Sequence, residues 1–222
     1  MHVKTTLAGM LLLLAAIWLM GCADVPSTGP TPPNLISEFR FVHAAGDVGN
    51  VGIAVDGASV GNIAFKGNVP HSQYPSGSRL AVLSTGDSLL VAMESYKRGT
   101  VVILPKTGPV REFIKLFERR VFDPVNTNNA LLRIVHAAEA PEVFVKIVGA
   151  TRTVRLNNAA YKSASSYLEL PVGNYTVTVA AASDTNTVLA STTLSAANKR
   201  QTSVILGSAS AGTLAFANLA DD

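Results

Sequence analysis

Most of this 222-residue chain consists of two copies of one pattern. The segment FRFVHAA at residues 39–45 recurs as LRIVHAA at residues 132–138, and an alternating apolar segment follows each copy after a polar turn. Further along, YPSG and KRGTVVIL in the first copy match LPVG and KRQTSVIL in the second. Because these four matches keep the same order at spacings of roughly 93 to 102 residues, the sequence indicates a tandem duplication of a whole domain.

Each copy contains short strand patterns separated by Gly, Pro, Asn and Asp turns. In the first copy, the predicted strands are residues 39–44, 51–55, 63–65, 80–83, 89–94 and 101–104. In the second copy, β-branched residues alternate most clearly over 175–179 and 191–194. About seven short strands of this kind are typical of a β-sandwich. We therefore predict an all-β fold of two tandem Ig-like antiparallel β-sandwich domains, at residues 35–125 and 126–222.

Residues 110–120, VREFIKLFERR, fit two patterns. Their apolar side chains recur at helical spacing, yet several also alternate as in a strand. By analogy with residues 212–218 of the second copy, we interpret this segment as the last strand of the first domain. The polar residues 123–129 then form the linker.

The first 34 residues differ from the rest of the chain. Residues 5–21 carry no charge and follow Lys4, as in a secretory signal peptide. They end in LMGC, which resembles the bacterial lipobox and predicts a signal peptide at 1–21, cleavage after Gly21 and lipidation of Cys22. Cys22 is the only cysteine of the chain. An uncleaved membrane helix is the alternative, because the apolar run is near the lower limit for crossing about 30 Å of hydrocarbon.

Residues 22–34 then form a Pro-rich tether, which favours an extended polyproline conformation. The resemblance to bacterial lipoproteins implies a diacylglycerol thioether and an N-acyl chain such as palmitate on Cys22, and therefore a membrane anchor. Ala23 at the second mature position implies the outer membrane by proteobacterial sorting. We expect a lipid-anchored protein of the bacterial cell envelope, at either the periplasmic or the outer face.

A family resemblance follows from the repeated motifs. The VHA motif, the strand that ends in Asp-Gly, and the turn and strand LPVGNYTVTV at residues 170–179 together resemble domain-of-unknown-function family 4397, DUF4397. The resemblance covers residues 39–222, and the second copy is the closer match. It implies secreted or anchored β-rich modules without an assigned activity.

Composition argues against several classes of function. Charged residues make up 15% of the chain and the formal net charge is only +3, so no basic stripe for nucleic acid is indicated. No His, Cys and carboxylate residues cluster at the spacing of metal ligands. The sequence therefore predicts no bound metal and no cofactor. A lone cysteine cannot form a disulfide within the chain, so stability must come from packing.

Two motifs could carry chemistry. The segment GASVG at residues 57–61 matches a nucleophile elbow, but that motif needs a helix after it, and here strand patterns flank both sides. We interpret it as a hairpin turn and predict no catalytic residue. His43 and His136 lie in the repeated apolar strands, where we expect each imidazole to bond a turn carbonyl and fix the strand to the next loop. A ligand or base role is the alternative.

The leading hypothesis is a non-enzymatic interaction or structural module with an envelope protein or polysaccharide as its partner. The alternative is an adhesin-like module that binds glycan or cell wall, and an esterase based on Ser59 is the least favoured. The only tryptophan, Trp18, lies in the predicted signal peptide. The five tyrosines are expected to cap sandwich edges or cores, which weakens the case for stacking on sugars. They are Tyr74, Tyr96, Tyr161, Tyr167 and Tyr175.

Overall fold

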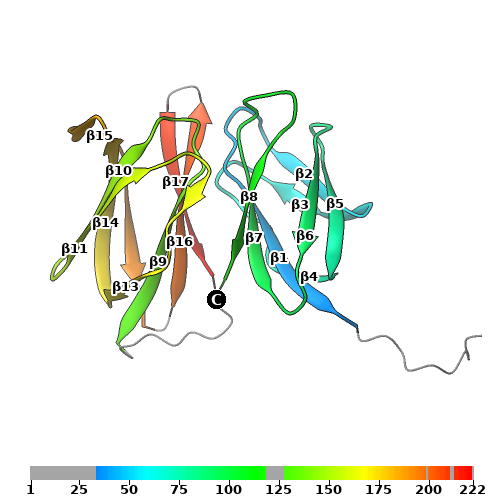
Figure 1. The fold of residues 1–222 in the computed structure, drawn as a ribbon, viewed down its shortest axis with the longest axis horizontal. Helices are drawn as coiled ribbons and strands as arrows, with labels where there is room; N and C mark the ends of the chain where they lie inside the picture. Colours follow the sequence, from blue (N-terminus) through cyan, green and yellow to red (C-terminus); the bar gives the residue numbers. More distant parts are fainter. Residues whose placement is uncertain (1–33, 119–127, 199, 211–212, 222) are drawn as a thin grey trace, which may run out of the picture. The chain divides into compact units, whose positions relative to one another are not determined.

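The computed structural model describes residues 34–118, 128–198, 200–210 and 213–221, and every regular element among them is a β-strand (Figure 1). Leu35–Asp222 form one compact unit. The predicted signal peptide, Cys22, nearly all of the tether, and the boundary between residues 125 and 126 lie outside the described residues. Within the described ranges, no helix is long and apolar enough to cross a membrane.

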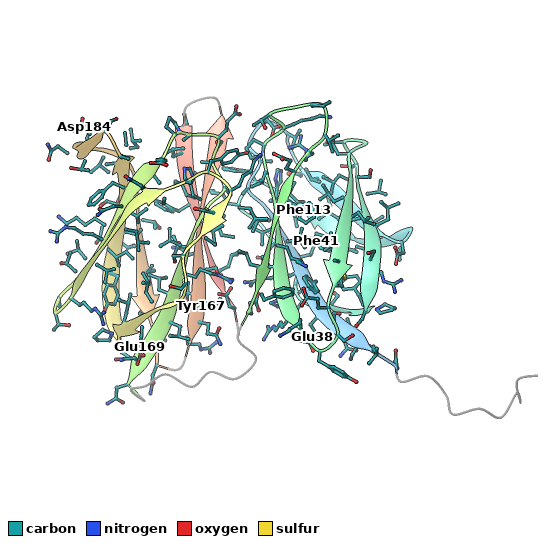
Figure 2. All side chains as sticks on the ribbon, viewed as in Figure 1. Glu38, Phe41, Phe113, Tyr167, Glu169 and Asp184 are labelled. Atoms are coloured by element: carbon teal, nitrogen blue, oxygen red, sulfur yellow. The ribbon has the colours of Figure 1, made fainter. Side chains whose placement is uncertain are left out.

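The first repeat folds into two sheets, with strand orders β4-β1-β7-β8 and β3-β2-β5-β6. Alternating side chains pack between these sheets, and Phe41 and Phe113 contact the same core (Figure 2). Its strands are β1 (Ile36–His43), β2 (Val51–Val55), β3 (Ala58–Ile63), β4 (Ser72–Pro75), β5 (Gly77–Leu83), β6 (Ser88–Met93), β7 (Arg98–Ile103) and β8 (Phe113–Phe117).

The second repeat has the same arrangement. Its sheets have the orders β12-β9-β16-β17, with β13 also paired to β9, and β11-β10-β14-β15. A separate core lies between them. The strands are β9 (Asn129–His136), β10 (Val143–Gly149), β11 (Thr153–Ala159), β12 (Ser163–Ala164), β13 (Leu168–Pro171), β14 (Gly173–Ala181), β15 (Asp184–Ala196), β16 (Gln201–Ser210) and β17 (Thr213–Ala220).

The all-β sandwich prediction is confirmed, with one addition to its topology. Most neighbouring strands are antiparallel, but β1 pairs parallel with β7 and β9 pairs parallel with β16. Hairpin patterns cannot reveal these pairs, because each joins two strands that are far apart in the chain.

The segment at residues 113–117 is a strand, as predicted, and its burial alternates along β8. The predicted strand at residues 63–65 is wrong, because β3 already begins at Ala58. Asp56 and Gly57 both have positive φ, at 50° and 84°. Two such residues form the tight turn of a two-residue hairpin, so the partner strand starts directly after them.

The parallel pairs correct the repeat alignment by one residue. Arg40 pairs with Thr100, and its equivalent Arg133 pairs with Ser203. Thr100 therefore corresponds to Ser203, whereas the sequence match of KRGT with KRQT aligned it with Thr202. Strand register is set by which side chains face the core, so one residue of slip would exchange the two faces of the strand.

The two sandwiches share a third core, formed by β1, β7 and β8 of the first repeat with β9, β16 and β17 of the second. Equivalent positions contribute from both sides, as in an isologous dimer interface. Members of the shared core are Val42, Ala44, Val102, Leu104, Ile114 and Leu116, with Val135, Ala137, Ile205, Ala217 and Leu219. The backbones come close here, since a Cβ added to Gly207 would lie 2.8 Å from the carbonyl oxygen of Ala44.

Candidate functional site

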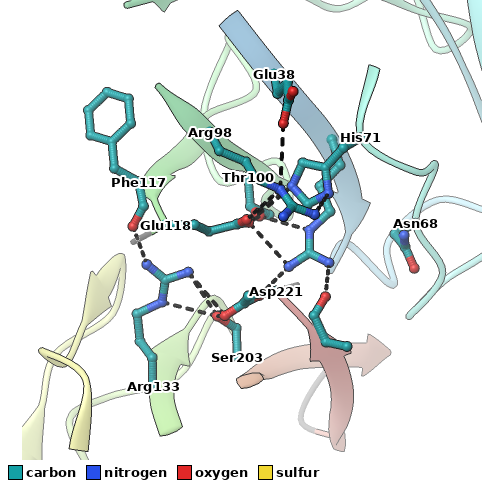
Figure 3. Close-up of polar contacts among 12 residues, drawn as sticks. Glu38, Asn68, His71, Arg98, Thr100, Phe117, Glu118, Arg133, Ser203 and Asp221 are labelled. Atoms are coloured by element: carbon teal, nitrogen blue, oxygen red, sulfur yellow. Dashed lines mark hydrogen bonds and ion pairs between the residues drawn. The ribbon is translucent and has the colours of Figure 1, made fainter. Parts of the chain in front are cut away.

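A buried ionic cluster lies beside the shared core (Figure 3). Its acids are Glu118 and Asp221, whose side chains are fully buried, and its principal bases are Arg40 and Arg133. Because successive side chains of a strand point to opposite faces, Arg40 faces the shared core while its neighbours in β1 face the core of the first repeat. Arg133 has the same position in β9.

In the first repeat, the cluster centres on Glu118. Thr100 Oγ1 accepts a hydrogen bond from Arg40 Nε at 2.9 Å and donates to Glu118 Oε1 at 2.6 Å. His71 Nε2 lies 3.2 Å from Glu118 Oε1, and Arg98 donates to His71 Nδ1 at 3.0 Å. Burial raises the pKa of Glu118, but the hydrogen bond from His71, the charge of Arg40 and the hydrogen bond from Thr100 together lower it below its usual value.

The second repeat builds the same unit around Asp221. Arg133 Nε donates to Ser203 Oγ at 3.0 Å, and Ser203 donates to Asp221 Oδ2 at 2.6 Å. Tyr167 donates to Asp221 Oδ2 at 3.0 Å, and its ring lies 4.7 Å from the Arg133 guanidinium carbon. Burial and then the charge of Asp221 raise the pKa of Tyr167. Tyr167 therefore holds the second acid, as His71 holds the first.

Each arginine also reaches across to the other repeat. Arg40 donates to the carbonyl of Ala220 and forms an ion pair with Asp221. Arg133 Nη1 donates to the carbonyl of Phe117 at 2.9 Å. Ala220 and Phe117 occupy equivalent positions, each directly before a buried acid. The cluster thus links the repeats in both directions, with its charges paired internally.

The two histidines make the carbonyl bonds that the sequence predicts. His43 Nε2 donates to Gly49 O at 2.8 Å, and Nδ1 accepts from Ala45 N at 3.2 Å. His136 Nε2 lies 3.2 Å from Pro141 O, while its buried Nδ1 has no hydrogen-bond partner. Burial lowers the pKa of both imidazoles, which favours the neutral form. A purely structural role stays a prediction.

The second repeat matches a known protein family. The family described as "Domain of unknown function (DUF4397)" matches residues 130–222. Residues 130–222 are therefore similar to this family. The predicted resemblance is confirmed there, and for the first repeat it stays a prediction based on shared motifs.

Other comparisons add little to the DUF4397 match. No curated protein matches the chain. A solved leucine-rich repeat protein from Bacteroides thetaiotaomicron matches at 12% identity with a TM-score of 0.21, over 76% of this chain. The chain spans only 26% of that protein's length, and similarity at this level supports no functional inference.

Ser59 lies in β3, opposite Ala54 of β2. The predicted hairpin is present, but its turn is Asp56-Gly57, and residues 58–61 of the GASVG segment belong to the strand. A strand follows Ser59 where a nucleophile elbow has a helix. Within the described part of the chain, no hydrogen bond joins the Ser59 hydroxyl to a histidine or a carboxylate. The described residues also contain no group of three or more His, Cys, Asp or Glu side chains that could hold a metal ion.

The tyrosines mostly face inward. Tyr74 and Tyr175 belong to the cores of the two sandwiches, and Tyr161 packs against the shared core. Tyr167 belongs to the ionic cluster. Only Tyr96, at 52% exposure, is an exposed aromatic among the residues the structure describes.

A second ionic network occurs in the first repeat at the loop before β8. Arg111 contacts Asp47 at 2.9 Å and Asp87 at 3.0 Å, and Lys106 contacts Asp87 at 2.7 Å. The hydrogen bond from Lys106 is the main cause that lowers the pKa of Asp87 to about 2. The partners of Asp47 are distant along the chain, so no local pattern in the sequence indicates this network.

Proposed function

We propose that this protein is a non-enzymatic module of the bacterial cell envelope, anchored by a lipid on Cys22, that presents its two sandwiches as one rigid body for contact with an envelope partner. The observation that carries the proposal is the pairing of polar groups in the ionic cluster beside the shared core. The charged groups of this cluster bind one another or nearby backbone, so their interactions hold the two repeats together. These groups are Arg40, Glu118, Arg133 and Asp221.

An interaction role fits this geometry better than catalysis does. Both acids of the cluster are buried, and each accepts a short hydrogen bond from a hydroxyl in its own sheet. A general base needs access to the proton that it removes. Ser59, the one serine with a catalytic sequence motif, lies in a hairpin strand.

The LMGC motif and the lone cysteine support the anchor. Stable attachment needs more than one hydrocarbon chain, since each buried methylene contributes about 0.8 kcal/mol. The lipid arrangement that the lipobox implies meets that requirement. The Pro-rich tether would then span about 35 Å if extended, at about 3.1 Å per residue.

The anchor is tested by metabolic labelling with a radioactive or clickable palmitate in cells that express the full-length chain. We expect label on the wild type and on Ser27→Ala, a tether variant that keeps the cysteine. Cys22→Ala should carry no label and should leave the membrane fraction or keep its signal peptide. Label that persists in Cys22→Ala would overturn the lipid anchor.

The non-enzymatic role is tested separately with the purified full-length protein on ester, peptide and glycan substrates. We expect no turnover by the wild type. Turnover that disappears in Ser59→Ala would replace the proposal with an esterase. Protease accessibility on intact cells, compared with cells whose outer membrane has been opened, then decides whether the partner is external or periplasmic.

A further inference from the structure

The two repeats differ most on the sheet faces that point away from the shared core. On sheet β3-β2-β5-β6, the outward side chains are largely apolar: Ala54, Leu80, Val82, Leu90 and Ala92. Leu90 is 64% exposed. On sheet β11-β10-β14-β15, the pairing registers place polar residues at the corresponding positions: Lys146, Thr176, Thr178, Thr193 and Ser195.

The polar face carries two adjacent positive charges. Lys146 of β10 is the cross-strand partner of Arg155 of β11. Their neighbours along each strand turn inward to the second core, so both cations point outward. Like charges directly opposite in a sheet are destabilising. Neither cation forms an ion pair within the described residues, and the equivalent positions of the first repeat are the neutral Ala54 and Ser59.

Hydroxyl groups continue the face beyond the cations. Lys146 pairs with Thr178, which pairs with Ser191 across β14 and β15. The next outward row runs from Val148, which is 37% exposed, through Thr176 to Thr193. Two uncompensated cations thus lie beside hydroxyl groups that can both donate and accept hydrogen bonds.

We propose that this surface, the cationic face formed by Lys146, Arg155, Thr176, Thr178, Ser191 and Thr193, binds an anionic polysaccharide. The ligand class is a polymer whose sugar units carry carboxylate, sulfate or phosphate groups. The cations pair with those groups, and the hydroxyl rows bond the sugar hydroxyls. This inference rests on the proposed interaction role and names its partner.

Other anionic partners fit the cationic face less well. Recognition of an anionic bilayer typically uses clusters of four to eight basic residues, and nucleic acid requires a basic stripe. Sugar binding by ring stacking would need exposed aromatic side chains. The only exposed aromatic among the described residues is Tyr96, which lies in the first repeat. Two cations among hydroxyls match a chain that carries both anionic groups and sugar hydroxyls.

The test measures binding of the full-length chain, purified in detergent, to dextran, dextran sulfate and polygalacturonate by affinity electrophoresis. We expect retardation by at least one of the two anionic polymers and none by neutral dextran. Lys146→Gln with Arg155→Gln should weaken binding at least tenfold. The matched control, Lys66→Gln with Lys97→Gln, removes the same charge from exposed positions of the first repeat and should stay within twofold of the wild type.

A second variant separates the hydroxyls from the charge. Thr176→Val with Thr193→Val keeps the shape and strand preference of both residues and should weaken binding about two- to fivefold. The thermal unfolding temperature of the Lys146→Gln, Arg155→Gln protein should be unchanged or slightly higher than that of the wild type, because the repulsion between the two cations is removed. This measurement excludes misfolding as the cause of lost binding.

Two results would overturn the cationic face as a polysaccharide site. They are the absence of binding to both anionic polymers and an equal loss in the Lys66→Gln, Lys97→Gln control. These failures leave palmitate labelling of Cys22 and the turnover assays untouched. Failure of the polysaccharide site and failure of the proposed envelope role are therefore distinguishable.

Discussion

The two repeats are alike where they face each other and different where they face outward. In the shared core, Val42 and Ala44 have the identical equivalents Val135 and Ala137. On the outer sheets, apolar Ala54 is replaced by Lys146 at the corresponding position. A face that packs against its own copy is constrained by complementarity from both sides. An outer face is free to diverge, so ligand specificity is expected there.

The ionic cluster shows that even the shared surface is only approximately symmetric. Arg40 contacts both buried acids, with Glu118 at 3.4 Å and Asp221 closer. Arg133 has Asp221 as its nearest carboxylate, at 3.7 Å. The two equivalent arginines should therefore differ in how much they stabilise the fold.

The largest effect is expected for Arg40→Met. It leaves two buried carboxylates short of a counter-charge, and breaking a buried pair typically costs about 3–5 kcal/mol. Arg133→Met should cost about 1–3 kcal/mol, because it mainly removes hydrogen bonds to Ser203 and Phe117. Urea unfolding of both variants measures the difference.

The double variant of Glu118→Gln and Asp221→Asn serves as the control for Arg40. With the acids neutral, Arg40→Met should cost less than it does in the wild-type background. Equal losses for Arg40→Met and Arg133→Met would show that the cluster acts symmetrically.

A middle-sized effect is expected at Gly99, whose equivalent in the second repeat is Thr202. A Cβ on Gly99 would lie 2.6 Å from the Phe39 ring and 2.7 Å from the Leu116 carbonyl oxygen. Gly99→Ala should therefore destabilise by about 1–3 kcal/mol through overpacking. Thr202→Ala should change stability by less than about 1 kcal/mol. If Gly99→Ala leaves the free energy of unfolding unchanged, the Phe39 ring can move aside.

Local patterns in the sequence predicted much of the fold. The repeated VHA motif and the alternation in β8 are short-range features, and the structure has the strands that they indicate. The hairpin predicted at GASVG is also present, although its turn is Asp56-Gly57. The parallel pairs and the one-residue register of β7 and β16 depend on long-range packing. No local pattern carries that information.

The ionic cluster was missed for the same reason. Arg40 and Asp221 are 181 positions apart, and the acids of the two repeats differ in residue type. One signal was available, because Arg40 and Arg133 are the second residues of the repeated motifs that also contain the two histidines. A charged side chain in a buried strand needs a partner, so this pair of arginines predicted buried acids without identifying them.

The smallest expected difference concerns the two histidines. His43→Leu leaves both Gly49 O and Ala45 N without their bonds, whereas His136→Leu affects only Pro141 O, so His43→Leu should cost about 1 kcal/mol more at pH 7.5. Because burial lowers the pKa of both imidazoles, the unfolded chain takes up protons first as the pH falls below 6.5. Wild-type stability therefore declines below pH 6.5, and urea unfolding at pH 5 should show a smaller cost for each leucine variant. A cost that is independent of pH would mean that the histidines do not titrate differently in the folded and unfolded chains.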